Sequence, residues 1–308
     1  MNANMASMAA LVDVDWDNFD PWRIQAVRHR LSDHPLLQRD QLVELGKRFR
    51  CSTRLFTFNN DADAAANFDA VARLYPNRKT VEESLRNIKE AKAWVLLRHV
   101  QADPAYRALV DRVLDPIQQE IERKDPGMYY RAGWIFVAAP HTITPFHIDR
   151  NHGILLQVRG TKTVYVWDAE DAEVVSDRAR DVFHASHNLE LVQWHEEFRE
   201  RAHVFKLGPG MGVYMPLTCP HMVETSDEPS TTISLTYSTD ATRRNAMVHV
   251  MHDLMHRKGI EPSAVGRHPL FDKLTYVAAS TLVAAHGPGS HLPACPSLAH
   301  HSAYAIAD

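Results

Sequence analysis

The sequence lacks the features that mark most secreted and membrane proteins. No apolar run approaches the roughly 20 residues that a transmembrane helix needs, so we expect no membrane partner. The N-terminal stretch MNANMASMAALVDVDW has no basic segment and soon turns acidic, unlike a secretory signal peptide. Cys51, Cys219 and Cys295 are the only cysteines and form no CxxC pair, which argues against a disulfide framework or a structural zinc site. We therefore expect a cytoplasmic protein with reduced thiols.

A large excess of one charge sign is also missing. The chain carries 34 Lys and Arg against 38 Asp and Glu, a formal net charge of −4. No global basic field is present, which disfavours nucleic acid as a partner and leaves only a local basic patch open. With 308 residues and 45% hydrophobic content, the chain has enough apolar material for one large domain, or for a core with helical additions.

Residues 1–125 predict a mostly helical region that packs on the core, with short strands at 54–58 and 93–100. Residues 20–35, DPWRIQAVRHRLSDHP, favour a short helix that has a proline near its start.

Two further helix starts in this region are marked by capping residues. Thr80 and Glu83 form a capping box, and Asp103 followed by Pro104 is typical of an N-cap and the first helical position. Pro116 predicts a break or kink in the second of these helices.

The pattern changes near residue 126. Between 126 and 240, short β-branched runs separated by turns predict an antiparallel sandwich or barrel. Residues 241–286 return to helical periodicity and predict a pair of helices. Residues 287–308 are rich in Gly, Pro, Ser and His, and we expect a flexible tail there. The fold class is thus a mainly β core with helical flanks.

The stretch TPFHID contains the candidate metal ligands. His147 and Asp149 are two residues apart, so a strand places both side chains on one face. One imidazole and one carboxylate supply two members of a 2-His-1-carboxylate triad, the ligand set of non-haem iron oxygenases. His221, which follows a proline at the edge of a later β run, is the candidate third ligand. The alternative is a hydrogen-bonded structural pair, since HxD is a common pattern.

Two more residues suit a pocket for a carboxylate beside such a metal. Thr144 precedes His147 by three residues, and Lys162 follows the turn RGT on the next expected strand. A lysine ammonium pairs with a carboxylate, and a threonine hydroxyl adds a hydrogen bond. Taken alone, Lys162 would be interpreted as a solvated lysine on an edge strand.

Together, TPFHID, QVRGTK and PHMVE resemble the JmjC or cupin-like Fe(II)/2-oxoglutarate-dependent dioxygenases, most closely the asparaginyl-hydroxylase-like group. The resemblance covers about 128–240 and implies a double-stranded β-helix, or jelly roll. It implies that His147, Asp149 and His221 bind Fe(II). Lys162 would hold the far carboxylate of 2-oxoglutarate, assisted by Thr144, and O2 would be the second cosubstrate.

The sequence departs from the family pattern at two positions. An asparagine often follows the aspartate by four residues, where this chain has Gly153, and Asn151 is the nearby substitute. Another asparagine is expected on the strand after the distal histidine, where Ser234 or Thr236 stands instead. The resemblance therefore leaves the detailed contacts to 2-oxoglutarate open.

The expected activity is hydroxylation of an unidentified substrate, either a protein side chain or a small molecule. The alternative from a different class is a non-catalytic cupin-like sensor or regulator that binds a metal or ligand. A metal-dependent isomerase or dioxygenase that uses no 2-oxoglutarate is a third hypothesis, and Lys162 argues against it. The C-terminal helix pair resembles the dimerisation element of related enzymes, which implies a possible homodimer. Two apolar helices could equally pack on their own sheet.

Several other residues have a structural and a functional interpretation. His249, His252 and His256 lie on one helix face and allow a second metal site, but histidines at the boundary of a packing helix are favoured. Cys219, two residues before His221, is better interpreted as an inert buried thiol than as a ligand. Tyr129, Tyr130 and Trp134 either line the substrate entrance or pack in the core.

Overall fold

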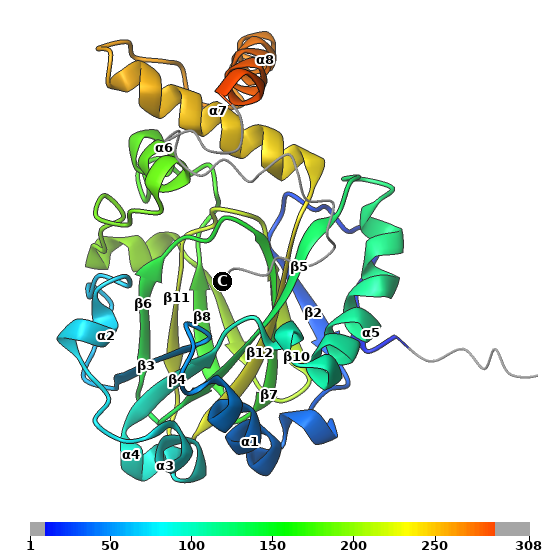
Figure 1. The fold of residues 1–308 in the computed structure, drawn as a ribbon, viewed down its shortest axis with the longest axis vertical. Coiled ribbons are helices and arrows are strands. Elements are labelled where there is room, and N and C mark those ends of the chain that lie inside the picture. The colour runs from blue at the N-terminus through cyan, green and yellow to red at the C-terminus, as the bar shows by residue number, and fades with distance from the viewer. Residues whose placement is uncertain (1–9, 287–308) are drawn as a thin grey trace, which may run out of the picture.

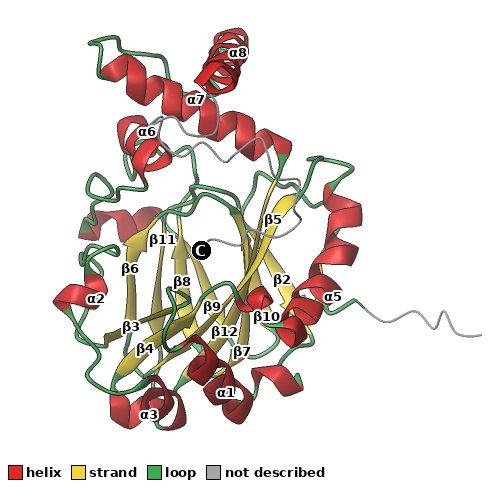
Figure 2. Cartoon of the chain, viewed as in Figure 1, coloured by secondary structure: helices red, strands yellow, loops and turns green. Residues whose placement is uncertain are grey.

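Two antiparallel β-sheets form the core of the computed structural model, which describes residues 10–286 (Figures 1 and 2). The larger sheet has eight strands in the order β1-β2-β10-β7-β12-β5-β4-β3, and the smaller has four in the order β6-β11-β8-β9. The bounds are β1 Val12–Asp13, β2 Gln25–His29, β3 Leu55–Asn59, β4 Ala93–Leu97, β5 Tyr129–Ala138, β6 Ile143–His147, β7 His152–Arg159, β8 Lys162–Val166, β9 His203–Leu207, β10 Met211–Met215, β11 His221–Thr225 and β12 Ser230–Ser238. The expected jelly-roll core is confirmed.

The two sheets pack against each other through an apolar cluster. Val164 and Val166 of β8 meet Leu155 of β7 and Val213 and Met215 of β10. These residues alternate along their strands, so their neighbours in sequence point to the outer faces of the sheets. The space between the sheets is where the candidate site lies.

Helices cover the outer faces and one end of the sheets. They are α1 Arg39–Phe49, α2 Val71–Leu74, α3 Val81–Arg86, α4 Ile88–Ala91, α5 Pro104–Ile121, α6 Asp177–Ser186, α7 Asp240–His256 and α8 Pro269–His286. Apolar residues of α1, α3 and α5 pack with the outward residues of the larger sheet, and α6 packs over β6 of the smaller sheet. Figure 1 shows α7 lying across the end of the sheets next to α6, with α8 beyond it.

The N-terminal region is less separate than expected. The helix predicted for 20–35 is wrong, because Gln25–His29 forms β2 and pairs with β10. Val27 and His29 are buried and alternate with exposed neighbours, so pairing with a distant strand overrides local helical periodicity. Four strands that precede residue 125 join the larger sheet, which therefore crosses the predicted boundary.

The capping predictions are confirmed. Thr80 and Glu83 form the reciprocal capping box of α3, and the Asp103 carboxylate accepts hydrogen bonds from the first turn of α5. Of the break or kink predicted at Pro116, the break is wrong, since α5 continues through Pro116 to Ile121. Pro116 is exposed, so water can solvate the helix carbonyl that loses its backbone partner.

The two C-terminal helices form as predicted. Along α8, Leu270, Leu274 and Val277 are exposed at helical spacing. In the part of the chain from 10 to 286, no helix combines the length and hydrophobicity needed to cross a bilayer. The tail predicted for 287–308 lies outside the described residues.

Candidate metal centre

The structure brings the three predicted ligands together. β6 and β11 are antiparallel neighbours, and His147 stands directly opposite His221 in their register. Asp149 follows β6 by two residues, and its carboxylate lies 3.8 Å from Nε2 of His221. One potential ligand atom from each residue lies within 4.8 Å of the others, and no second group in residues 10–286 meets this criterion. Two imidazoles and one carboxylate converging in this way fit a facial triad.

Both histidines are held in the tautomer that a metal requires. Nδ1 of His147 donates to the carbonyl oxygen of Pro145 at 2.7 Å, and Nδ1 of His221 donates to that of Cys219 at 3.0 Å. Because a carbonyl oxygen can only accept, each Nδ1 carries the proton and each Nε2 keeps its lone pair. Burial, followed by the nearby His221, lowers the pKa of His147 to about 4. Neutral imidazole is the form that binds a metal ion.

Packing and backbone contacts fix the ligands further. The ring of Phe68, from the loop before α2, stacks on His147 with centroids 4.4 Å apart and an interplanar angle of 10°. The Thr218 amide donates to the carbonyl oxygen of Asp149 at 2.7 Å, which ties together the two loops that carry ligands. Cys219 supplies its carbonyl, while burial raises the pKa of its thiol to about 12, so the thiol stays protonated as the inert interpretation requires.

A β-bulge turns Thr144 toward the same face as His147. Thr144 and His147 are three positions apart, which in a regular strand would put them on opposite faces. The register shifts between the His147–His221 and Thr144–Val223 pairs, so the extra residue restores a common face. The Thr144 hydroxyl accepts a hydrogen bond from the Trp94 indole at 3.0 Å, which leaves its own proton to donate.

Lys162 lies on the same face of the smaller sheet, four residues along β8 from the level of the histidines. Val166 stands opposite His221, and Lys162 stands opposite Thr225. The Lys162 side chain is only 6% exposed, and burial lowers its pKa to about 7. Within residues 10–286 no hydrogen bond or ion pair is made by its amine. A buried amine without a partner fits the end of an anionic ligand.

The residues proposed to replace the family asparagines lie around the same space. Thr236 stands opposite Gly153 on β7, and its hydroxyl accepts from the Trp134 indole at 3.1 Å. Ser234 stands opposite Leu155 and thus shares the inner face. Asn151 uses its amide to donate to Ser238 at 2.6 Å, at the end of β12. Their contact with 2-oxoglutarate stays a prediction.

Comparison with known proteins agrees with this architecture. A sequence model of the cupin-like domain family matches residues 14–243. The chain belongs to the cupin-like domain family. The match begins between β1 and β2 and ends in α7, so β2, β3 and β4 are part of the domain.

Solved structures show more distant likeness to this cupin-like chain. Escherichia coli ycfD is 13% identical, with a TM-score of 0.45 over 90% of this chain and 69% of that one. The E. coli ribosomal oxygenase YcfD in complex with cobalt and 2-oxoglutarate is also 13% identical, with a TM-score of 0.44 over 87% and 67%. The DMSP lyase DddQ from Ruegeria pomeroyi is 18% identical, with a TM-score of 0.24 over 35% and 39%. A search of curated proteins found no match.

Sequence reasoning missed Arg98 and His99 of this cupin-like domain. Arg98 follows β4, and its guanidinium lies 4.5 Å from the centroid of the Phe56 ring. His99 has a left-handed backbone (φ 50°) and places its ring 4.7 Å from Trp134. Burial, and then the Arg98 and Arg54 charges, lower the pKa of His99 to about 4. No motif marks these residues, because their neighbours come from distant strands.

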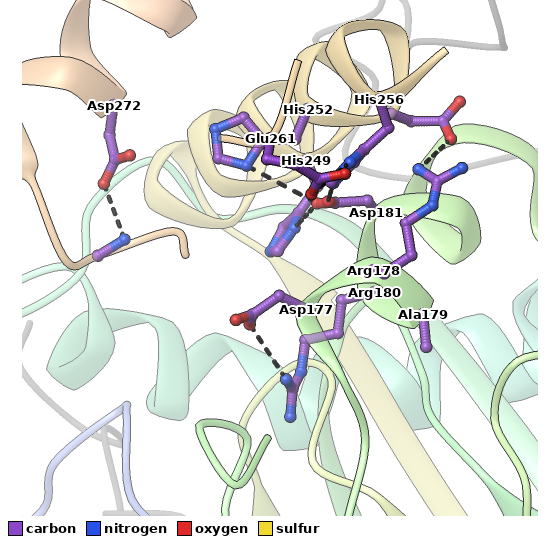
Figure 3. A network of polar contacts seen from close by, with 12 residues as sticks. Asp177, Arg178, Ala179, Arg180, Asp181, His249, His252, His256, Glu261 and Asp272 are labelled. Carbon is purple, nitrogen blue, oxygen red and sulfur yellow. Dashed lines mark hydrogen bonds and ion pairs between the residues drawn. The ribbon is translucent and has the colours of Figure 1, made fainter. Parts of the chain in front are cut away.

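Two of the three histidines of α7, His249 and His256, hydrogen-bond Asp181 of α6, and His252 lies beside them (Figure 3). His249 lies 2.7 Å from one carboxylate oxygen of Asp181, His256 lies 3.2 Å from the other, and His252 is 3.9 Å away. Asp181, His249 and His252 are buried. The contacts of His249 and His256 with Asp181 join α7 to α6 and fit the helix-packing interpretation.

Proposed function

We propose that this cupin-like chain is an Fe(II)- and 2-oxoglutarate-dependent oxygenase that hydroxylates a protein side chain or a small molecule. The observation that carries the proposal is the shared face of the triad and Lys162. The triad at one end of this face suits a metal ion. The unpaired, buried amine of Lys162 further along the face suits the far carboxylate of a dicarboxylate that binds between the metal and Lys162. A site that only bound metal would gain nothing from a buried, unpaired lysine.

In the overall reaction, one oxygen atom of O2 enters the hydroxylated product and the other enters succinate. Substrate R–H, O2 and 2-oxoglutarate yield R–OH, succinate and CO2. Iron(II), when bound, supplies the redox chemistry that couples oxidative decarboxylation of 2-oxoglutarate to insertion of oxygen into the substrate C–H bond. A facial triad leaves three coordination positions for exogenous ligands.

The protein residues provide position and charge. His147, Asp149 and His221 would hold the iron through atoms already converged on one point. Lys162 would neutralise the far carboxylate of 2-oxoglutarate, and Thr144 would donate to it while Trp94 holds the hydroxyl in place. Phe68 shields one face of the His147 ring from water. Preorganised ligands and charges of this kind lower the reorganisation needed for reaction.

Two measurements test the proposal. Anaerobic addition of Fe(II) and then 2-oxoglutarate should produce a visible charge-transfer band, and aerobic incubation should release succinate. Both should be lost in His147→Ala and Asp149→Ala and retained in His203→Ala, which removes an exposed histidine. Succinate release that persists in both ligand variants would refute the assignment. A band without succinate release, across a broad substrate screen, would favour the non-catalytic sensor.

A further inference from the structure

Arg98 is a partly buried cation close to the metal centre that the proposed reaction has not used. Its guanidinium lies over the Phe56 ring, Phe56 contacts Phe68 with centroids 6.0 Å apart, and Phe68 stacks on His147. Two ring contacts therefore connect Arg98 to a metal ligand. Asp149 and Asp69 are the acidic groups close enough to act on it electrostatically.

Neither acid neutralises Arg98 directly. In the described residues, no carboxylate lies within ion-pair distance of its guanidinium, and its Nε is buried without an acceptor. Asp69 already accepts a hydrogen bond from the Leu189 backbone. Asp149 faces Nε2 of His221 as a member of the triad. The buried Nε–H of Arg98 thus has no acceptor among the described residues, which costs free energy of desolvation.

The surroundings of Arg98 favour an anion as the missing partner. Arg54 and Arg98 both act electrostatically on His99, so a second guanidinium group lies near Arg98. A divalent metal at the triad would share the charge of Asp149 and make the region still more positive. The Phe56 ring covers one side of the Arg98 guanidinium and limits its hydration, which strengthens pairing with an anion.

This anion is distinct from 2-oxoglutarate. Lys162 stands opposite Thr225, whereas the triad lies at the His221 end of the same strand. One carboxylate of 2-oxoglutarate is assigned to the metal and the other to Lys162, so both ends of the cosubstrate are engaged. Arg98 lies on the Phe68 side of His147 and is left for the substrate.

We propose that Arg98 binds a carboxylate or phosphate group of the substrate and that the substrate is therefore an anionic molecule or side chain. The inference rests on the proposed function, because it concerns the second substrate of the same site. A guanidinium can pair with either group through two parallel hydrogen bonds.

The test uses Mn(II), a paramagnetic ion, bound to the full chain with saturating 2-oxoglutarate. Inorganic phosphate is the probe in one arm, with relaxation followed by 31P NMR, and 13C-labelled acetate is the probe in the other. Mn(II) in the triad should enhance relaxation of the probe that binds nearby. The arm with the tighter binding identifies the anion class.

Arg98→Gln should weaken probe binding at least about tenfold, the loss of one charge-assisted contact. Arg98→Lys keeps the positive charge but loses the paired N–H donors of the guanidinium. Its affinity for the probe should lie between those of Arg98→Gln and the original protein. Arg123→Gln, at an exposed arginine paired with Glu120, should bind the probe normally. Calorimetry on each variant separately measures loading of Mn(II) and 2-oxoglutarate.

Each outcome decides a different claim. Equal probe binding in the Arg98 variants and the original protein would overturn the inference, as would no probe binding to a fully loaded site. Loss of Mn(II) loading in both Arg98 variants would also overturn it, since Arg98 would then serve Asp149. Failure of the original protein to load Mn(II) and 2-oxoglutarate would instead contradict the proposed function.

Discussion

His147 and His221 face each other across adjacent strands, and each ring donates its Nδ1 proton to the carbonyl oxygen two residues earlier in its own chain. The repeated contact fixes both rings with Nε2 directed to the same point. Ligand geometry is therefore set by backbone atoms of β6 and of the segment before β11, before any metal binds.

Removal of the Phe68 ring should weaken metal binding without removing a ligand. Phe68→Ala deletes the ring stacked on His147, so that imidazole gains rotational freedom and contact with water. We expect metal affinity to fall by about tenfold, the lower end of effects seen when groups that support metal ligands are lost. Calorimetric titration with Mn(II) measures it. Phe271→Ala, at an exposed phenylalanine of α8, is the control, and equal affinities in the two variants would contradict the role.

Binding of 2-oxoglutarate should weaken as the pH rises above about 7. Burial lowers the pKa of Lys162 to about 7, so the free protein loses the ammonium above that pH, while below it the cation is present. The apparent Kd should then rise by up to about tenfold per pH unit. Titrations between pH 6 and 9 measure the slope.

The matched variants separate charge from packing at this position. Lys162→Arg stays charged across the range and should remove the pH dependence, whereas Lys162→Met should bind weakly at every pH. A slope in Lys162→Arg equal to that of the original protein would assign the titration to another group.

Loss of the Asp181 charge should destabilise the packing of α7 on α6. Asp181→Asn replaces a buried carboxylate that contacts His249 and His256, leaving those rings with weaker partners. We expect a loss of about 2–4 kcal/mol in the free energy of unfolding, measured with urea. Glu173→Gln, at an exposed ion pair with Arg201, should change it by less than about 0.5 kcal/mol. Similar values for the two would show that the network contributes little.

Stability should fall on acidification below about pH 6.5, in part through His184. Both of its ring nitrogens are buried without partners, and burial lowers its pKa well below 6.5. His249, Arg150, His187 and Arg180 add positive charge around it. Below pH 6.5 the unfolded chain therefore binds a proton at His184 that the folded chain does not bind. The free energy of unfolding is full above pH 6.5 and decreases as the pH falls toward the pKa of His184 in the folded chain.

His184→Phe should make the acid dependence less steep, by up to about 1.4 kcal/mol per pH unit. Phenylalanine keeps a ring against His249, which stacks on His184 at 4.8 Å. Urea unfolding at pH 7, 6 and 5 measures the slope. His203→Ala, at an exposed histidine, should leave it unchanged, and an unaltered slope in His184→Phe would exclude this contribution.

The homodimer stays a prediction, and α8 offers a direct test. Leu270 and Leu274 are 80% and 70% exposed, at the i, i+4 spacing that forms an apolar stripe. If this stripe pairs with a second copy of the chain, Leu274→Glu should convert a dimer into a monomer in light scattering. Lys273→Glu, at the neighbouring exposed position, is the control. A monomeric original protein would exclude the dimer.

Local chemistry made much of this protein predictable. The capping box of Thr80 and Glu83 depends on residues three apart, and the shared face of His147 and Asp149 depends on the period of a strand. His221 and Lys162 were candidates from their places beside a β run and a turn, and motif resemblance gave each a role. The register of β8 and β11 places both on that face.

Tertiary structure decided the rest, because it depends on contacts between residues far apart in the chain. Residues 25–29 pair with β10 as a strand although their local pattern favours a helix. The bulge that turns Thr144 inward exists only in the register between β6 and β11. The packing of Phe56 and Phe68 connects Arg98 to the metal centre. Local hydrogen bonding and periodicity determine which elements can form, whereas burial and strand pairing determine which of them do and what they bring together.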